Sequence, residues 1–274
     1  MVCGRFRVMD AHCHIFPDKI AEKAAAATNR FYGMEGQPAC SGTVAQLLAE
    51  SEAAGIDRLV VHSVATKPEQ VSAINAFIAA QAAAYPGRLL GLGTMHADFP
   101  EPEAEIGRFH ALGLHGLKMH PDIQQTAIDD PRCLPIYRLC AREGLPVLLH
   151  TGDARYDLSN PDRLIPVLKA FPDLKVIGAH FGGYSIWEQA AEQLAGFPNL
   201  WVDCSSSLPF LTPQKAVDLI RRYGADRVLF GSDYPMWSPH RELARFLQLD
   251  LTDAEKRLIL WDNAARLYGL PVEV

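Results

Sequence analysis

The sequence lacks any long uninterrupted apolar stretch, which argues against a membrane-spanning helix. No run of about 18 consecutive apolar residues occurs. The most apolar predicted helix, from Ile74 to Tyr85, is interrupted by Asn75 and Gln81. The first residues show neither an apolar signal region nor a small-residue cleavage site. We therefore expect a cytoplasmic protein without a membrane partner.

Basic runs and paired cysteines are also missing. Lys and Arg number 26 against 32 Asp and Glu, giving a formal net charge of −6, and a mildly acidic chain without a basic run is a poor nucleic-acid binder. No CxxC pair occurs, and a chain of this length can form a large core without disulfides. We expect reduced thiols at all six cysteines, which are Cys3, Cys13, Cys40, Cys133, Cys140 and Cys204.

What the chain does contain is a regular alternation of short apolar runs with helical patterns. Each run is four to eight residues long, ends in a polar residue and is followed by an amphipathic or Ala-rich segment. Thr252 and Glu255 have the spacing of a helix-capping box before the last of these segments. The predicted strands are Phe6–Asp10, Arg58–His62, Leu89–His96, Gly116–His120, Pro146–His150, Lys175–His180, Leu200–Asp203 and Val228–Asp233.

Eight strands in this rhythm predict a (β/α)8 TIM barrel, since alternating strands and helices form parallel sheets. A doubly wound dinucleotide-binding sheet is the alternative, but no GxGxxG follows the first strand. We expect one domain over residues 1–274. A small insertion from about Lys19 to Ser41 would form a lid or short helix over the barrel mouth.

The histidines are concentrated at the predicted strand ends, where TIM barrels carry their active sites. Seven of the ten lie at or just after such an end, and Asp203 and Asp233 finish the last two strands. Packing alone does not explain so many polar residues on one rim. The seven are His12, His14, His62, His96, His120, His150 and His180.

The motif His12-Cys-His14 is the strongest single indication of a metal. Residues two apart in an extended segment share a face, so both imidazoles can hold one ion. With His150, His180 and Asp233 on neighbouring strand ends, the site favours Zn²⁺ or another borderline divalent ion. Such an ion would activate a water molecule, with Asp233 moving its proton. His180 would be a further ligand or would stabilise an oxyanion.

Five short motifs, in this order along the chain, resemble the amidohydrolase superfamily. Within it they are similar to the amidohydrolase-2 branch, which includes aminocarboxymuconate semialdehyde decarboxylase. The resemblance implies that His12, His14, His150 and Asp233 bind one metal ion, usually zinc, that His180 is the catalytic imidazole, and that the protein forms a homodimer. The motifs are His12-Cys-His14, Leu-Lys118-Met-His120-Pro, Leu-His150-Thr-Gly, Ala-His180-Phe-Gly-Gly and Gly-Ser-Asp233-Tyr-Pro.

Lys118 has two readings. In some branches of the superfamily a lysine on the fourth strand is carbamylated and bridges two metal ions. Alternatively, Lys118 remains an ammonium group, takes part in catalysis and attracts a carboxylate substrate. We favour one ion, and with it the ammonium.

Other polar residues near the rim are candidates for substrate binding. Arg155 could bind a substrate carboxylate through two parallel hydrogen bonds, or form an ion pair with Asp153 or Asp157. Asp10 would orient a ligating histidine, and Asp203 would cap the loop that follows it. His62 and His96 are read as pocket walls or core residues, and the remaining substrate-binding candidates are His120, Tyr156, Tyr184 and Trp237.

These features predict a metal-dependent hydrolase that acts on a small, anionic carbonyl compound, such as an amide, lactone or ester. The alternative is a metal-dependent non-oxidative decarboxylase or hydratase of a small carboxylic acid, because the metal ligands would be the same. A metal-binding barrel without turnover is the non-enzymatic alternative. The expected partner is a small carboxylate-bearing molecule.

Overall fold

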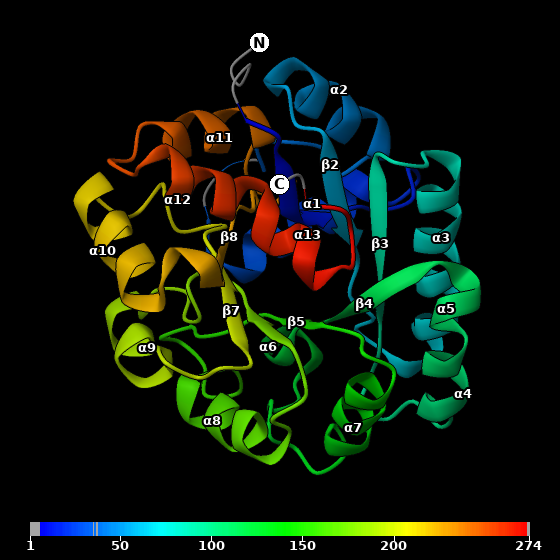
Figure 1. Ribbon diagram of the computed structural model, residues 1–274. Helices are drawn as coiled ribbons and strands as arrows, with labels where there is room; N and C mark the ends of the chain where they lie inside the picture. Colours follow the sequence, from blue (N-terminus) through cyan, green and yellow to red (C-terminus); the bar gives the residue numbers. More distant parts are fainter. Residues whose placement is uncertain (1–5, 35, 37, 273–274) are drawn as a thin grey trace.

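A computed structural model describes residues 6–34, 36 and 38–272. Its eight strands are parallel, and each pairs with the next strand along the chain, as Figure 1 shows. The ring closes where Ala11 N–H donates to the Phe230 carbonyl (2.8 Å) and Asp233 N–H donates to the His12 carbonyl (2.9 Å). The predicted TIM barrel is confirmed. The strands are β1 (Met9–His14), β2 (Arg58–His62), β3 (Leu89–Thr94), β4 (Leu114–Met119), β5 (Val147–Leu149), β6 (Val176–Gly178), β7 (Leu200–Asp203) and β8 (Val228–Leu229).

Helices connect successive strands and surround the barrel (Figure 1). Thr252 accepts a hydrogen bond from Glu255 N–H while the Glu255 carboxylate accepts from Thr252 N–H, so the predicted capping box is present. The α-helices are α1 (Ala21–Phe31), α2 (Val44–Ala54), α3 (Val71–Ala84), α4 (Pro102–Gly107), α5 (Phe109–Leu112), α6 (Pro121–Gln124), α7 (Leu134–Arg142), α8 (Pro161–Ala170), α9 (Trp187–Leu194), α10 (Pro213–Tyr223), α11 (Pro239–Leu247), α12 (Asp253–Arg257) and α13 (Asn263–Leu267).

Two strand boundaries differ from the prediction in ways that matter for the site. The first strand begins at Met9 instead of Phe6 and runs to His14, so His12-Cys-His14 lies within β1 and not after it. Cys13, which lies between the two histidines in the sequence, packs its side chain into the outer core. The alternation of inward and outward side chains therefore continues to the end of β1. The last strand stops at Leu229, where its pairing with β7 ends, and the backbone of Phe230 and Asp233 then bonds to β1.

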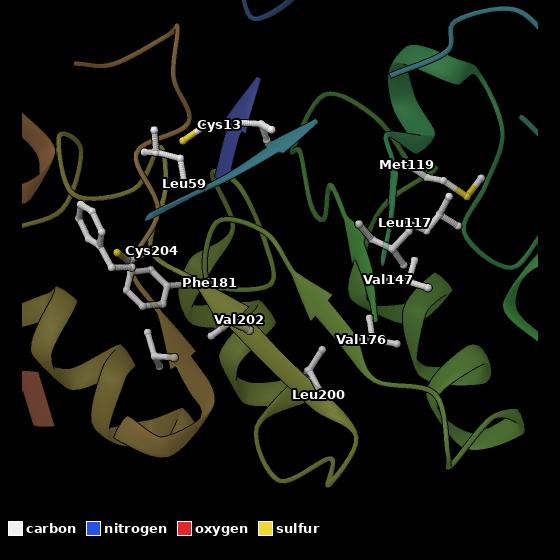
Figure 2. Close-up of a cluster of buried hydrophobic side chains, with 14 of the residues drawn as sticks. Cys13, Leu59, Leu117, Met119, Val147, Val176, Phe181, Leu200, Val202 and Cys204 are labelled. Atoms are coloured by element: carbon white, nitrogen blue, oxygen red, sulfur yellow. The ribbon is translucent and has the colours of Figure 1, made fainter. Parts of the chain in front are cut away.

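The core has two layers. Alternate strand residues point outward against the helices, among them Leu117, Val147, Val176 and Val202 in Figure 2. The residues between them point into the barrel, where α13 closes the end opposite the histidines, in the centre of Figure 1. Inward-facing Val60 and Leu148 thus lie beneath the polar rim and fill the barrel as a solid floor.

Among the described residues, no helix is long and apolar enough to cross a membrane. Cys13, Cys40, Cys133, Cys140 and Cys204 are buried free thiols, as the scattered cysteine pattern predicts. Cys3 lies outside the described residues.

Candidate active site

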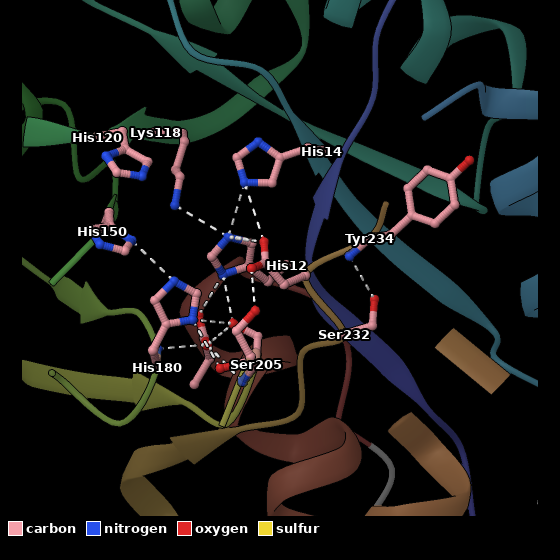
Figure 3. A network of polar contacts seen from close by, with 12 residues as sticks. His12, His14, Lys118, His120, His150, His180, Ser205, Ser232 and Tyr234 are labelled. Atoms are coloured by element: carbon pink, nitrogen blue, oxygen red, sulfur yellow. Dashed lines mark hydrogen bonds and ion pairs between the residues drawn. The ribbon is translucent and has the colours of Figure 1, made fainter. Parts of the chain in front are cut away.

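The rim side chains of β1 and of the segment after β8 converge on one position. His12 Nε2 lies 3.3 Å from His14 Nε2, and both nitrogens lie 3.4 Å from Asp233 Oδ1 (Figure 3). Ligands bound tetrahedrally at about 2.1 Å from an ion stand roughly 3.4 Å apart. The spacing of these three atoms is therefore that of ligands around one ion.

The protonation of His12 is set by its second nitrogen. His12 Nδ1 lies 2.9 Å from Asp203 Oδ2, which can only accept, so Nδ1 carries the proton and Nε2 presents a lone pair to the cluster. Asp203 Oδ1 accepts from the N–H groups of His180 and Ser205 and from the Ser205 hydroxyl. Asp203 thus orients the His12 imidazole in addition to capping its loop.

His150 and His180 form the other half of the cluster. His180 Nδ1–H donates to the Ser205 carbonyl (2.9 Å), which leaves a lone pair on Nε2. His180 Nε2 faces His150 Nδ1 at 3.1 Å (Figure 3). Because Asp122 Oδ2 lies 3.6 Å from His150 Nε2, we assign the His150 proton to Nε2. Two lone pairs then face each other, an arrangement that a cation between them would stabilise.

Two of these residues hold unusual backbone conformations. His180 has φ of 58° and Asp233 has φ of 60°, both in the left-handed region that non-glycine residues seldom occupy. Such strain is concentrated at functional sites, where the surrounding structure enforces it. Here it turns both side chains inward just beyond the ends of β6 and β8.

Lys118 lies beside this cluster with its ammonium group fully enclosed. It points inward from β4 between the outward-facing Leu117 and Met119, and Nζ lies 3.2 Å from His12 Nε2. Burial lowers the pKa of Lys118 to about 8, against the opposing effect of Asp233 and Asp203. An ammonium group is thus available near neutral pH at the inner end of the site.

The ionisation states of the convergent groups suit a metal ion. Burial lowers the pKa of His12 to about 4, with Lys118 adding to the effect, and burial also lowers the pKa of His14 and His150. Burial opposes ionisation of Asp233, but neighbouring His12 and His14 hold its pKa well below the usual value. Neutral imidazoles beside an ionised carboxylate are the forms that bind metals.

A cavity of about 650 Å³ opens above the cluster. Its floor is polar and includes His120 and Lys118, while its walls are largely apolar and come from α1, α3 and the loops after β1 and β4. Volumes between about 300 and 1,000 Å³ are typical of sites for small molecules. The main apolar wall residues are Phe16, Ile20, Phe31, Ile74, Phe77 and Ile123.

The contacts of Arg155 and Tyr156 lie away from the cluster of His12, His14 and Asp233. Arg155 binds both oxygens of Asp153, with Nε at 2.9 Å and Nη2 at 2.6 Å, which is the ion-pair alternative raised by the sequence. Its third contact is the Phe31 carbonyl (2.7 Å). The Tyr156 ring stacks on Phe31 at 5.2 Å. Both residues support the end of α1, and neither contact reaches the cavity floor.

Tyr184 and Trp237 lie at a second, narrow opening of the site, together with His180 and Asp233. The Tyr184 ring is 5.7 Å from that of His180. Trp237 Nε1–H donates to Ser206 Oγ (2.9 Å), whose own hydroxyl donates to Asp233 Oδ2 (2.5 Å). These positions agree with the predicted wall residues, and Trp237 orients Asp233 through Ser206.

Of the two histidines read as pocket walls or core residues, His62 lies beside His12 and His14 and His96 does not. His62 packs against the rings of His12 (4.9 Å) and His14 (4.4 Å), and neither of its nitrogens has a hydrogen-bond partner among the described residues. His96 instead accepts the N–H of Asp98. Asp10 accepts the backbone N–H groups of His12 and Ser232 and so supports the main chain, and the prediction that it orients an imidazole is wrong.

Tyr32 and Asp122 are site residues that the sequence did not reveal. The Tyr32 hydroxyl lies 2.7 Å from His120 Nε2 and 3.2 Å from His150 Nδ1. Asp122 lies below His150 and accepts a hydrogen bond from Ser159 (2.5 Å). Neither belongs to a strand-end motif. The one signal for Tyr32 was its position in the insertion expected to cover the mouth.

The sequence profile of the amidohydrolase family matches residues 9–270, so the chain belongs to that family. It is 24% identical to 2-amino-3-carboxymuconate-6-semialdehyde decarboxylase of Dictyostelium discoideum over 72% of this chain and 66% of the relative. It is also 27% identical to γ-resorcylate decarboxylase of Polaromonas sp. over 36% of each chain. The chain thus aligns with a third to two thirds of the length of these relatives.

Solved structures show the same fold. A TIM-barrel protein of uncharacterised function from Bordetella bronchiseptica superposes with a TM-score of 0.78 at 26% identity, over 96% of this chain and 99% of the other. The 5-carboxyvanillate decarboxylase of Sphingomonas paucimobilis superposes with a TM-score of 0.76 at 18% identity, over 97% and 100%. The corresponding enzyme of Novosphingobium aromaticivorans, at 16% identity and a TM-score of 0.75 over 97% of each chain, contains manganese.

The donor atoms of the site have the chemistry that a divalent metal ion requires. Nitrogen and carboxylate donors are the ligands of zinc and other borderline divalent ions. Here acceptors on the outer side fix the tautomers of His12 and His180, so that both imidazoles turn a lone pair toward the cluster. His12, His14 and His62 also offer ligand atoms that all lie within 4.8 Å of one another.

Proposed function

We propose that the protein is a metal-dependent, non-oxidative decarboxylase of a small aromatic or unsaturated carboxylic acid. The observation that carries this proposal is the buried Lys118 ammonium group beside the convergent ligands, at the floor of a cavity with apolar walls. Both curated relatives are decarboxylases by name, and the hydrolase prediction finds no such support. Hydrolysis is therefore the weaker reading.

The cavity fits a substrate with an anionic end and an apolar body. The carboxylate would lie at the floor, next to Lys118, and the body would contact rings such as Phe31 and Phe77. An apolar enclosure strips water from the carboxylate, whose charge is localised, while loss of CO2 disperses that charge over an unsaturated system. The enclosure thus favours the reaction, while binding is favoured by the contacts of the apolar body and by the charge of Lys118.

We assign one divalent ion to His12, His14, His150 and Asp233, with His180 next to it. When bound, the ion supplies a Lewis acid for the substrate carboxylate. The unmodified Lys118 ammonium group holds the same carboxylate by charge and hydrogen bonding. The second-metal alternative would require a carbamate on Lys118 in place of this charge.

The chemical step needs one proton at carbon. The bond between the carboxyl group and its neighbouring carbon breaks, the electron pair stays on that carbon, and CO2 leaves. A proton then forms the new C–H bond. Because Asp233 is ionised before the reaction, we assign it to take up one proton from solvent and pass it to the carbon, while Ser206 orients its second oxygen. His180 lies beside it as the imidazole that stabilises the developing charge.

The proposal is tested by a panel of benzoic and muconic acids, with matching amides and lactones, incubated with protein reconstituted separately with Zn²⁺ or Mn²⁺. We expect CO2 release with an equal amount of decarboxylated product, and its loss in Asp233→Asn. Cleavage of amides or lactones without CO2 would refute the decarboxylase and restore the hydrolase. No turnover on either group in any metal form would count against both.

A further inference from the structure

Helix α1 crosses the cavity and ends at the metal cluster, although it belongs to none of the strand-end motifs. Six of the residues that line the cavity, from Ile20 to Tyr32, come from this segment. Tyr32, just after the last helical residue, is the one that reaches the polar floor, where its hydroxyl contacts His120 and His150.

Hydrogen-bond accounting fixes the direction of these contacts. His120 Nδ1 accepts from the backbone N–H of Ile123 (3.3 Å), so its proton is on Nε2 and is donated to the Tyr32 oxygen (2.7 Å). The Tyr32 proton is then free to be donated, and in this structure it faces His150 Nδ1 at 3.2 Å. That nitrogen carries the lone pair that we assign to the metal ion. A bound ion would occupy it, and the Tyr32 proton would have to find another acceptor.

The position of Tyr32 is fixed from outside the cavity. Arg155 donates to the carbonyl of Phe31 (2.7 Å) while both oxygens of the buried Asp153 hold its guanidinium group. Tyr156 stacks on the Phe31 ring with an interplanar angle of 11°. The end of α1 is thereby tethered to the loop after β5, and Tyr32 is held over the cluster.

We propose that Tyr32 recognises the substrate by donating a hydrogen bond to its carboxylate, with His120 as the residue that orients the phenol. This inference rests on the proposed function, because it takes the anionic group of the substrate to lie beside the ion. The preference for a carboxylate over a neutral group is thereby assigned to Tyr32, the residue that directly follows α1.

The test measures binding and not turnover. Benzoate, a probe with a carboxylate and an apolar ring, is titrated calorimetrically into Zn²⁺-loaded wild type, Tyr32→Phe and the matched control Tyr85→Phe, whose tyrosine is exposed on the outside of the barrel. Loss of a hydrogen bond to a charged group costs about 1.5–3 kcal/mol, so we expect benzoate affinity to fall about 10- to 100-fold in Tyr32→Phe alone. Benzamide binding should change little.

Zn²⁺ affinity, measured by chelator competition, separates this role from that of a metal ligand. Tyr32→Phe should bind Zn²⁺ as tightly as wild type or more tightly, since its hydroxyl competes for His150 Nδ1. A drop in Zn²⁺ affinity would make Tyr32 a ligand and overturn the proposal. Unchanged benzoate affinity, or no benzoate binding to wild type, would overturn it too.

A double-mutant cycle tests the part assigned to His120. If His120 acts through the phenol, His120→Ala in the Tyr32→Phe background should cost no further benzoate affinity. Additive losses would refute the orienting role. CO2 release by wild type is scored separately, so a failed decarboxylase and a failed carboxylate site give different results.

Discussion

Replacing Asp203 with asparagine should weaken metal binding although Asp203 is not a ligand. Its Oδ1 accepts from three donors, while Oδ2 accepts from His12 Nδ1 alone. An asparagine would turn its carbonyl oxygen toward the three donors, so its NH2 group would face His12 Nδ1. The imidazole would then have to accept at Nδ1 and carry its proton on Nε2, which is the nitrogen we assign to the ion.

The size of the effect follows from this change of tautomer. Loss of such an outer partner typically costs 10- to 100-fold in metal affinity, or about 1.4–2.7 kcal/mol. We expect a decrease in that range in Zn²⁺ affinity, measured by competition with a chromophoric chelator at pH 7.5. Thermal unfolding of the metal-free proteins shows whether the variant remains folded.

Asp10→Asn is the matched control, since Asp10 is also fully buried at the rim. Its Oδ1 accepts the backbone N–H groups of His12 and Ser232, and no imidazole donates to it among the described residues. The carbonyl oxygen of an asparagine can keep the contacts of Oδ1, and its NH2 group can take the place of Oδ2. Zn²⁺ affinity should therefore change by less than about threefold. Wild-type affinity in Asp203→Asn, or an equal loss in both variants, would refute the tautomer argument.

Three further changes test other parts of the structure. Lys118→Met should lower benzoate affinity about 10- to 100-fold by calorimetry, without reducing bound Zn²⁺ by mass spectrometry; halved metal content would instead indicate a bridging carbamate. Arg155→Met should raise KM more than it lowers kcat, because α1 loses its tether; steady-state kinetics showing an unchanged KM would contradict this role. Glu242 is fully buried, and burial raises its pKa from 4.5 to about 7 against the opposing charge of Arg245. The folded state therefore holds a proton that the unfolded state releases above pH 4.5, so wild type should lose on the order of 3 kcal/mol of stability between pH 4.5 and 8. Urea unfolding should show a flatter pH profile for Glu242→Gln, and parallel profiles would disprove the assignment.

The strand pattern was readable from the sequence because each strand is apolar on both faces and ends in a polar residue. Arg58–His62 and Leu200–Asp203 were predicted with their observed bounds. The ends of β1 and β8 were not, since closure of the barrel is a contact between the two ends of the chain that no local pattern contains. The backbone hydrogen bond from Asp233 N–H to the His12 carbonyl is one of these contacts.

The side chains of the site also divide into those that a local sequence pattern predicts and those that depend on contacts between distant parts of the chain. His12, His14 and Asp233 were identified because their spacing relative to the strands places them on one rim. Tyr32 was not, since its contact with His120 spans 88 residues and depends on where α1 lies. Arg155 was ambiguous because Asp153, two residues away, is as good an acceptor as any substrate carboxylate.

We propose that one divalent ion, held by His12, His14, His150 and Asp233, serves a decarboxylase. The most direct measurement is the amount of CO2 released from the carboxylic acid panel by protein of known metal content. We expect the amount of CO2 released to rise with metal occupancy up to one ion per chain. We expect no CO2 release after chelation or in Asp233→Asn. CO2 release that persists without metal, or that requires two ions per chain, would contradict it.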